Sequence, residues 1–150
     1  MNGYTLFMDK DILIFQNRDI IVKIDISNVV YFEANGNFTN IVTRNKSTRS
    51  VYVNLGQMDS FLKYAMPDIA EKFVRIGRKH IVNLDYIHLI DTLKKEMILS
   101  DCSHFTFKLN CSKESLKTLR ELLQKFTREK YLLIECGNSS SAKPAISDNI

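Results

Sequence analysis

The chain has 150 residues, of which 45% are apolar and 25% charged, so it has the composition of a folded protein and not of a disordered or fibrous one. No apolar run approaches the roughly 18 residues of a membrane span and the first residues lack the order of a signal peptide, which predicts a cytoplasmic protein. The net charge of +4 arises between residues 71 and 136, where thirteen basic and nine acidic side chains indicate a surface that faces a polyanion, although a basic protein can also simply be soluble.

Short runs rich in Ile, Val, Phe and Tyr recur along the chain and predict β-strands, separated by pieces rich in Asn, Gly and charged residues. Many short strands at close spacing predict antiparallel sheets and not an alternation of strands and helices. We therefore predict a mainly β fold, an elongated stack of small antiparallel sheets with about ten short strands, one short helix and one C-terminal amphipathic helix. The runs include ILIF, IIVKI, VVYFEA, FTNIVT, HIVNL, EMILS and FTFKL.

Two segments have helical spacing. In residues 55–66 the apolar side chains fall on one stripe, and Pro67 follows where this short helix is expected to stop. In residues 112–130, SKESLKTLRELLQKFTREK, the leucines form one face among basic side chains. Ser112 is the expected N-cap of this second helix.

The domain organisation follows from these elements. We expect residues 1–19 to form an N-terminal strand extension and residues 20–134 to form the main domain. Residues 135–150 are small and polar without periodicity, which predicts a disordered tail.

The sequence offers little for catalysis. Its three histidines lie far apart without the spacing of a ligand pair, and its three cysteines match neither a disulfide framework nor a zinc site. Sequence motifs for a nucleophile elbow, a P-loop and a dinucleotide site do not occur. We therefore predict no catalytic residue, no metal and no cofactor, and we expect the cysteines to be reduced thiols.

The segment EANGNFTN, residues 33–40, has the composition of a loop that contacts nucleic acid. Asn37, Thr39 and Asn40 carry short side chains that donate and accept hydrogen bonds, as base edges and phosphate oxygens require. The alternative is a plain hairpin turn, because Asn and Gly tolerate the positive φ angles of turns.

A second loop, RIGRK, concentrates positive charge between two apolar strands. Residues 72–84 contain no acidic residue, and His80 is a further candidate for positive charge. Gly77 allows the chain to bend, so that Arg78 and Lys79 can reach outward and bind phosphate. The alternative is a charged strand edge that prevents aggregation between sheets.

Four segments follow one another in a distinctive order: VVYFEANGNFTNIV, VYVNLGQMDSFL, FVRIGRKHIVNLDYI and SKESLKTLRELL. Over roughly residues 20–126, this order resembles the LytTR DNA-binding domain of bacterial transcription regulators. The resemblance implies three small antiparallel sheets whose inter-strand loops enter successive major grooves of double-stranded DNA. It also implies direct-repeat sites, bound by a homodimer or by paired copies.

The resemblance places the DNA contacts on both loops and at the start of the last helix. Lys113 stands where the family usually has Arg, Gly77 where it has His or Asn, and Lys79 and His80 where Ser and an aromatic residue are usual. Lysine binds phosphate but lacks the guanidinium fork, so these departures favour phosphate contacts over base contacts. The predicted DNA-binding residues are Asn37, Thr39, Asn40, Arg44, Arg78, Lys79 and Lys113.

We predict a transcription regulator that binds specific DNA sequences, without membrane contact and without a small-molecule substrate. Only about twenty residues precede the domain, which leads us to expect no receiver domain. One alternative is a protein-interaction module that pairs with a larger regulator and has little DNA affinity of its own. A less favoured alternative is binding of RNA or single strands, for which Phe38 is the one aromatic residue in a suitable loop.

Overall fold

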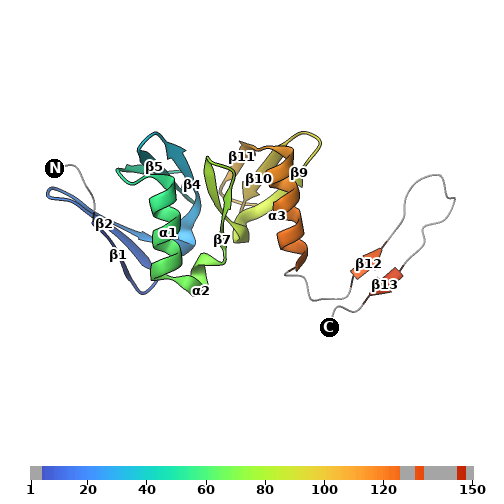
Figure 1. Cartoon of the computed structure of the whole chain (residues 1–150), viewed down its shortest axis with the longest axis horizontal. Helices are drawn as coiled ribbons and strands as arrows, with labels where there is room; N and C mark the ends of the chain where they lie inside the picture. Colours follow the sequence, from blue (N-terminus) through green and yellow to red (C-terminus); the bar gives the residue numbers. More distant parts are fainter. Residues whose placement is uncertain (1–4, 126–130, 134–144, 148–150) are drawn as a thin grey trace. The chain divides into compact units, whose positions relative to one another are not determined.

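The computed structural model describes residues 5–125, 131–133 and 145–147. The chain divides into two compact units, residues 1–116 and residues 117–150, and each is described by itself (Figure 1). No helix in the described ranges is both long enough and apolar enough to cross a membrane.

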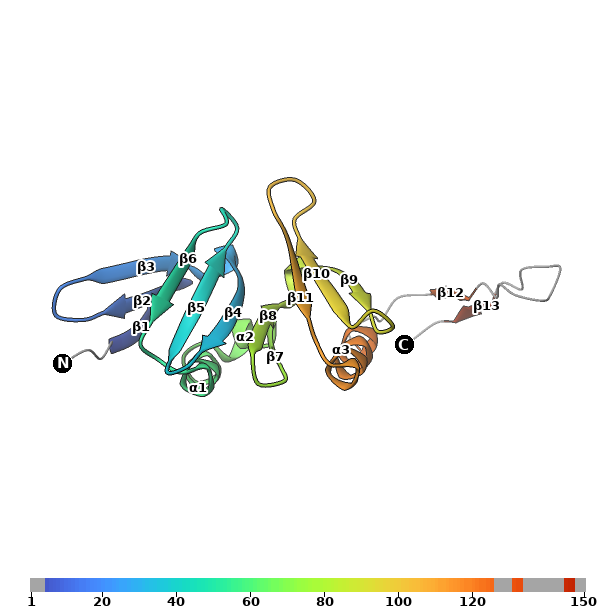
Figure 2. The same ribbon diagram turned by 90° about the horizontal axis from the view of Figure 1, so that it is seen from above.

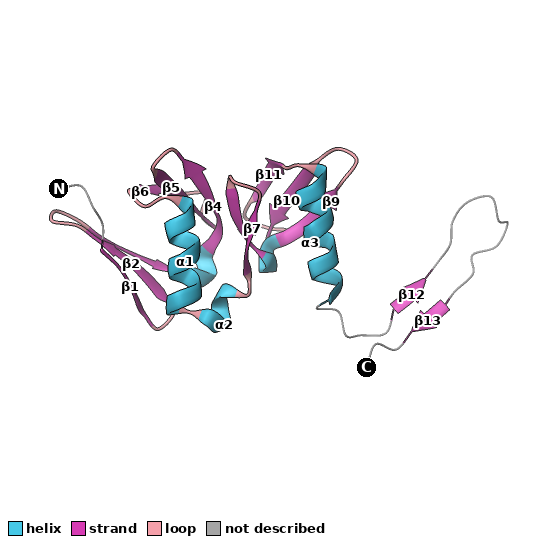
Figure 3. Cartoon of the chain, viewed as in Figure 1, coloured by secondary structure: helices cyan, strands magenta, loops and turns pink. Residues whose placement is uncertain are grey.

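The first unit contains three antiparallel sheets (Figure 3). The strand orders are β1-β2-β3, β6-β5-β4-β8-β7 and β11-β10-β9. The strands are β1 (Thr5–Asp9), β2 (Ile12–Gln16), β3 (Ile21–Asp25), β4 (Val29–Asn35), β5 (Phe38–Thr43), β6 (Thr48–Val51), β7 (Phe73–Ile76), β8 (His80–Asn83), β9 (Ile87–Asp91), β10 (Glu96–Ser100) and β11 (Thr106–Asn110).

Helices connect several of these strands. Short 3₁₀ helices precede β4 and β9, and the α-helices follow β6 and β11. In the second unit, β12 (Tyr131–Leu133) pairs antiparallel with β13 (Ala145–Ser147). The helices are η1 (Ile26–Asn28), α1 (Leu55–Ala65), α2 (Pro67–Ala70), η2 (Leu84–Tyr86) and α3 (Lys113–Lys125).

The core of the first unit is built on β4, whose first four residues are all buried. Four consecutive buried positions mean that both faces of the strand are covered. Phe32 of β4 belongs to one hydrophobic cluster with Leu13 and Phe15 of β2 and with Met58 and Leu62 of α1. The sheet β1-β2-β3, helix α1 and the central sheet therefore share one core.

The predicted mainly β architecture of antiparallel sheets is confirmed, and both predicted helices are present. The last helix begins at Lys113, and Ser112 Oγ accepts the backbone N–H of Ser115 at 3.1 Å, as expected of an N-cap. Pro67 follows the end of α1 but also opens the short helix α2, which the sequence pattern did not predict. Proline suits that place because the first turn of a helix leaves its N–H groups unpaired.

The described N-terminal residues form β1 and β2, two strands of the first sheet. Strand β2 pairs with β3 across the expected boundary at residue 20, and Leu13 and Phe15 are fully buried. Within the tail that we expected to be disordered, Ala145–Ser147 form β13. The rest of residues 135–150 lies outside the described residues.

Candidate nucleic-acid interface

Strand register brings two loops to the same end of the central sheet (Figure 2). The turn between β4 and β5 follows the pair Asn35–Phe38, and the β7–β8 loop, residues 77–79, follows the pair Ile76–His80. Strand β4 also pairs with β8, and the Ala34 amide donates to the Lys79 carbonyl at 2.8 Å. The two loops therefore rise from neighbouring strand ends.

Each of these loops contains a glycine in the left-handed region of backbone space. Gly36 has φ +61° and Gly77 has φ +60°, angles that side-chain-bearing residues rarely adopt. A Cβ on Gly77 would lie 3.6 Å from Ser115 Oγ, which is ordinary contact. The positive φ angle therefore explains why glycine occupies position 77 better than a lack of space for a side chain does. The same contact shows that the β7–β8 loop lies beside the first turn of α3.

A third loop, between β9 and β10, lies near the start of α3. The Cys111 amide donates to the Lys95 carbonyl at 3.0 Å, which holds the β9–β10 loop against the segment that leads into α3. Its two lysines are exposed, as are the cations of the β7–β8 loop and the start of α3. We call Arg78, Lys79, Lys94, Lys95 and Lys113 the basic edge.

The cations of the basic edge are available for a ligand. Within the described part of the chain, none of the five has a carboxylate within ion-pair distance, whereas Lys63, Lys72 and Lys108 elsewhere each pair with an acid. An uncompensated cluster of this kind attracts a polyanion and leaves the side chains free to adjust to it. Sequence reasoning missed Lys94 and Lys95, for which the turn LKK was the available signal.

Asn37 lies in the exposed β4–β5 turn and lines a pocket of about 510 Å³ beside the start of α1. Asn54 and Gln57 line the same pocket, but their side chains cap the helix: Asn54 Oδ1 accepts from the Gln57 amide and Gln57 Oε1 accepts from the Asn54 amide. Asn40 lies further along β5 and is half-buried. Among these amides, Asn37 is the one best placed to meet a ligand.

Thr39 does not face a ligand, contrary to our expectation. Its side chain is 0% exposed, and its Oγ1 donates to the Val53 carbonyl at 2.7 Å. Thr39 therefore ties β5 to the segment after β6, and we remove it from the candidate interface.

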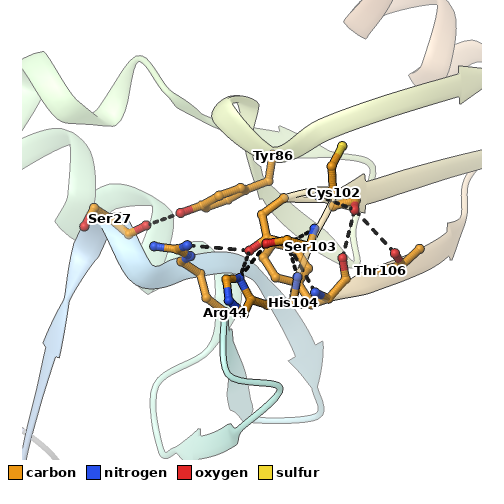
Figure 4. Close-up of polar contacts among 10 residues, drawn as sticks. Ser27, Arg44, Tyr86, Cys102, Ser103, His104 and Thr106 are labelled. Atoms are coloured by element: carbon orange, nitrogen blue, oxygen red, sulfur yellow. Dashed lines mark hydrogen bonds and ion pairs between the residues drawn. The ribbon is translucent and has the colours of Figure 1, made fainter.

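Arg44 is also separated from the basic edge. It follows β5 at the end opposite Asn37, and a strand of this length spans about 20 Å. Its amide donates to the Asn28 carbonyl, its Nη2 lies 3.5 Å from Asp101 Oδ2, and its guanidinium lies 5.9 Å from the Tyr86 ring centre (Figure 4). The structure therefore does not bring Arg44 together with the other predicted DNA-binding residues.

Asp101 organises the β10–β11 loop, because its Oδ1 accepts the backbone N–H groups of Ser103, His104 and Phe105. Burial would raise its pKa, but hydrogen bonds from the amides of Ser103, His104 and Phe105 and from the His104 ring hold the pKa of Asp101 well below its usual range. The His104 Nδ1 lies 2.9 Å from Asp101 Oδ2. Asp101 is therefore ionised at ordinary pH and fixes the β10–β11 connection.

His80 lies beneath the basic edge and does not add to its charge. It is 5% exposed, and its Nε2 lies 3.1 Å from Glu33 Oε2. Burial lowers the pKa of His80, and this effect outweighs the opposite influence of Glu33, which favours the charged ring. His80, a candidate for positive charge in the sequence, is therefore neutral near neutral pH.

The fold and the basic edge together define a small β scaffold whose loops carry exposed cations. The family model of the LytTr DNA-binding domain matches residues 19–124, so the chain belongs to the LytTR DNA-binding domain family, whose function is DNA binding in transcription regulators and not catalysis. The structure is similar to the LytTr DNA-binding domain of a Bacillus cereus protein assigned as a methyl-accepting/DNA response regulator, with a TM-score of 0.54 and 22% identity over 77% of this chain and 98% of that chain. At this identity the likeness concerns the fold alone. No curated protein matches the chain.

Replacing Thr39 with valine separates a structural role from a DNA contact. T39V keeps the shape but leaves the Val53 carbonyl without its donor, so we expect the free energy of unfolding to fall by about 1–2 kcal/mol in urea denaturation. T48V, at an exposed position on β6, is the control and should change it by less than about 0.5 kcal/mol. A T39V protein of unchanged stability and reduced DNA affinity would contradict the structural role.

The lowered pKa of His80 predicts a pH-dependent stability. As pH falls, the unfolded chain binds a proton at His80 before the folded chain does, because the folded pKa of His80 is lowered. The contribution of neutral His80 to the free energy of unfolding is therefore complete above about pH 6.5 and is lost as pH falls toward the folded pKa. H80Q keeps a donor for Glu33 but does not titrate. Urea denaturation between about pH 8 and about pH 5 should therefore show a larger loss for the wild type than for H80Q. Equal losses in the two proteins would contradict the buried, neutral His80.

Proposed function

We propose that the basic edge binds double-stranded DNA in a sequence-selective manner, as part of a transcription regulator. The observation that carries the proposal is the convergence of five exposed cations without acidic partners in the described residues on one end of the first unit. The electrostatic attraction between such cations and phosphates acts over a long range, and it does not require the side chains to be held rigidly. A rigid sheet beneath the loops would set their spacing on the duplex.

The residues of the proposed interface have different roles. Arg78 is the one guanidinium of the basic edge, and its fork suits two parallel hydrogen bonds to a guanine edge or a phosphate. The lysines act as phosphate anchors. Asn37 is the candidate for contact with an adenine edge, and Asn40 is kept as a secondary contact because it is half-buried.

We further propose that the β4–β5 turn and the β7–β8 loop enter successive major grooves and that two copies bind direct repeats. Both loops are short and extend from one sheet end, as a β-based reader requires. The family implies the same mode of binding. Selection from a random duplex library, followed by sequencing, would reveal a repeated element and its spacing.

Removing both cations of the β7–β8 loop should weaken binding in a salt-dependent way. For R78A/K79A, we expect lower affinity and a salt dependence flatter by up to about 0.9 log units per lost phosphate contact. Fluorescence anisotropy on a labelled duplex between about 50 and 200 mM salt measures the slope. K23A/R49A is the matched control, because it also removes two exposed cations but at positions away from the basic edge. Equal slopes for wild type and R78A/K79A would contradict the proposed role.

Asn37 should affect the choice of sequence more than the overall affinity. Loss of a base contact in N37A is expected to cost about 1–3 kcal/mol on the preferred site and little on random DNA. Parallel selections with wild type and N37A should differ at one base position of the consensus. Identical consensus sequences would remove Asn37 from the proposed interface.

A protein-interaction module is the second candidate function. It is favoured by Leu93, which is 86% exposed beside Lys94 and Lys95, and by the exposed ring pair Phe38 and Tyr52, whose centres lie 5.0 Å apart. Exposed apolar groups on a charged surface are more typical of protein partners than of DNA contacts. Failure of the wild type to bind any duplex at low salt would favour this candidate.

A further inference from the structure

A second group of cations lines a pocket far from the basic edge. The pocket has a volume of about 520 Å³ and lies between β3, the end of β5 with the turn that follows it, and the β10–β11 loop. Arg44 belongs to it, so the pocket lies at the end of β5 opposite Asn37. The cationic and titratable residues that line it are Lys23, Asp25, Arg44, Arg49 and His104.

The charges in this pocket are poorly balanced. Lys23 and Arg49 are exposed and, among the described residues, have no carboxylate within ion-pair distance. The one acidic lining residue, Asp25, already accepts hydrogen bonds from the amide and hydroxyl of Ser27 through Oδ1. Asp101 Oδ2 lies 3.5 Å from Arg44 Nη2 and neutralises part of the charge of Arg44. A net positive field therefore remains at the mouth.

Arg44 adds an unpaired donor. Its Nε is buried and has no hydrogen-bond partner among the described residues, although its Nη2 reaches Asp101. A buried charged N–H without an acceptor is destabilising, and such groups in proteins are nearly always satisfied by protein, water or a ligand. Lys23 and Arg49 line the same pocket as this guanidinium and bring two further cations to it.

We propose that this pocket binds a small molecule that carries an oxyanion, either a phosphate or a carboxylate group. The oxyanion is held between the partly exposed Arg44 side chain, Lys23 and Arg49, while the body of the ligand rests on the apolar lining of Val22 and Ile24. The pocket volume lies in the range of small-molecule sites. The site is separate from the proposed DNA interface, and its occupation does not depend on that function.

The test is a ¹H–¹⁵N NMR titration of the full chain with inorganic phosphate and, separately, with acetate, each against sodium chloride at equal ionic strength. We expect saturable shifts of the Arg44 Nε–H signal and of the amides of residues 43–47 with at least one of the two anions. K23A/R49A should weaken this binding by roughly tenfold, as expected for loss of charge-assisted contacts, while R78A/K79A should leave it unchanged.

Three outcomes would overturn the site. These are no saturable shift with either anion, an Arg44 Nε–H signal that does not respond, and equal weakening by R78A/K79A, which would indicate general attraction of anions. Titration with duplex DNA separates the two proposals: DNA shifts confined to the basic edge support a distinct pocket, and DNA shifts that include Arg44 Nε–H overturn it. If K23A/R49A unfolds at the same temperature as the wild type, its loss of binding does not come from loss of the folded structure.

Discussion

The pairing of β4 with β8 is the constraint on which the interface depends. It joins Glu33 to His80, positions far apart in the chain, through two strands whose side chains are largely buried. The Asn83 side-chain amide donates to the Val29 carbonyl at 2.9 Å and closes the other end of this pair. A register slip of one residue would exchange the side chains on the two covered faces and would disrupt the packing of Phe32 and Ile81. Core packing thus fixes where the two polar loops stand relative to each other.

The two ends of the central sheet use cations in different ways. At one end, Arg44 is held by Asp101 and lies over the Tyr86 ring, so its charge contributes to joining the β10–β11 loop to the sheet. At the other end, Arg78 and its neighbouring lysines have no such partners among the described residues. The Arg44–Asp101 pair contributes to the structure although Arg44 Nε lacks an acceptor among the described residues, whereas the cations of the basic edge remain free to exchange small counterions for a polyanion. Charge counted along a sequence does not separate these two situations.

Much of the fold was predictable because strand periodicity, glycines and helix caps are local signals. The two polar loops were predictable for the same reason, since Gly36 and Gly77 mark turns with positive φ. The directions of the side chains were not predictable from these local signals. Thr39 lies three residues after Gly36, and only the register of β5 shows that it shares the buried face with Ile41.

The sequence did not reveal the place of Lys95 or the neutral state of His80, and the physical reason is similar for both. Lys95 reaches the basic edge through a hydrogen bond with Cys111, a contact between segments far apart in the sequence. His80 adjoins exposed Lys79, yet alternation along the strand buries the histidine and lowers its pKa. Each outcome depends on tertiary contacts, which set exposure and protonation and which composition does not reveal.

The backbone at Gly77 offers a physical reason for one departure from the family pattern. The resemblance places His or Asn at this position, and Asn is among the few residues that tolerate the left-handed region in which Gly77 lies. Glycine therefore preserves the conformation of the loop while removing a side chain that could read a base. What remains at the tip is Arg78, with a guanidinium fork, and Lys79, with a point charge. In the proposed mode of DNA binding, recognition at this loop depends on one arginine, so the neighbouring turn with Asn37 supplies more of the sequence selectivity than its counterpart in relatives with a polar residue at position 77.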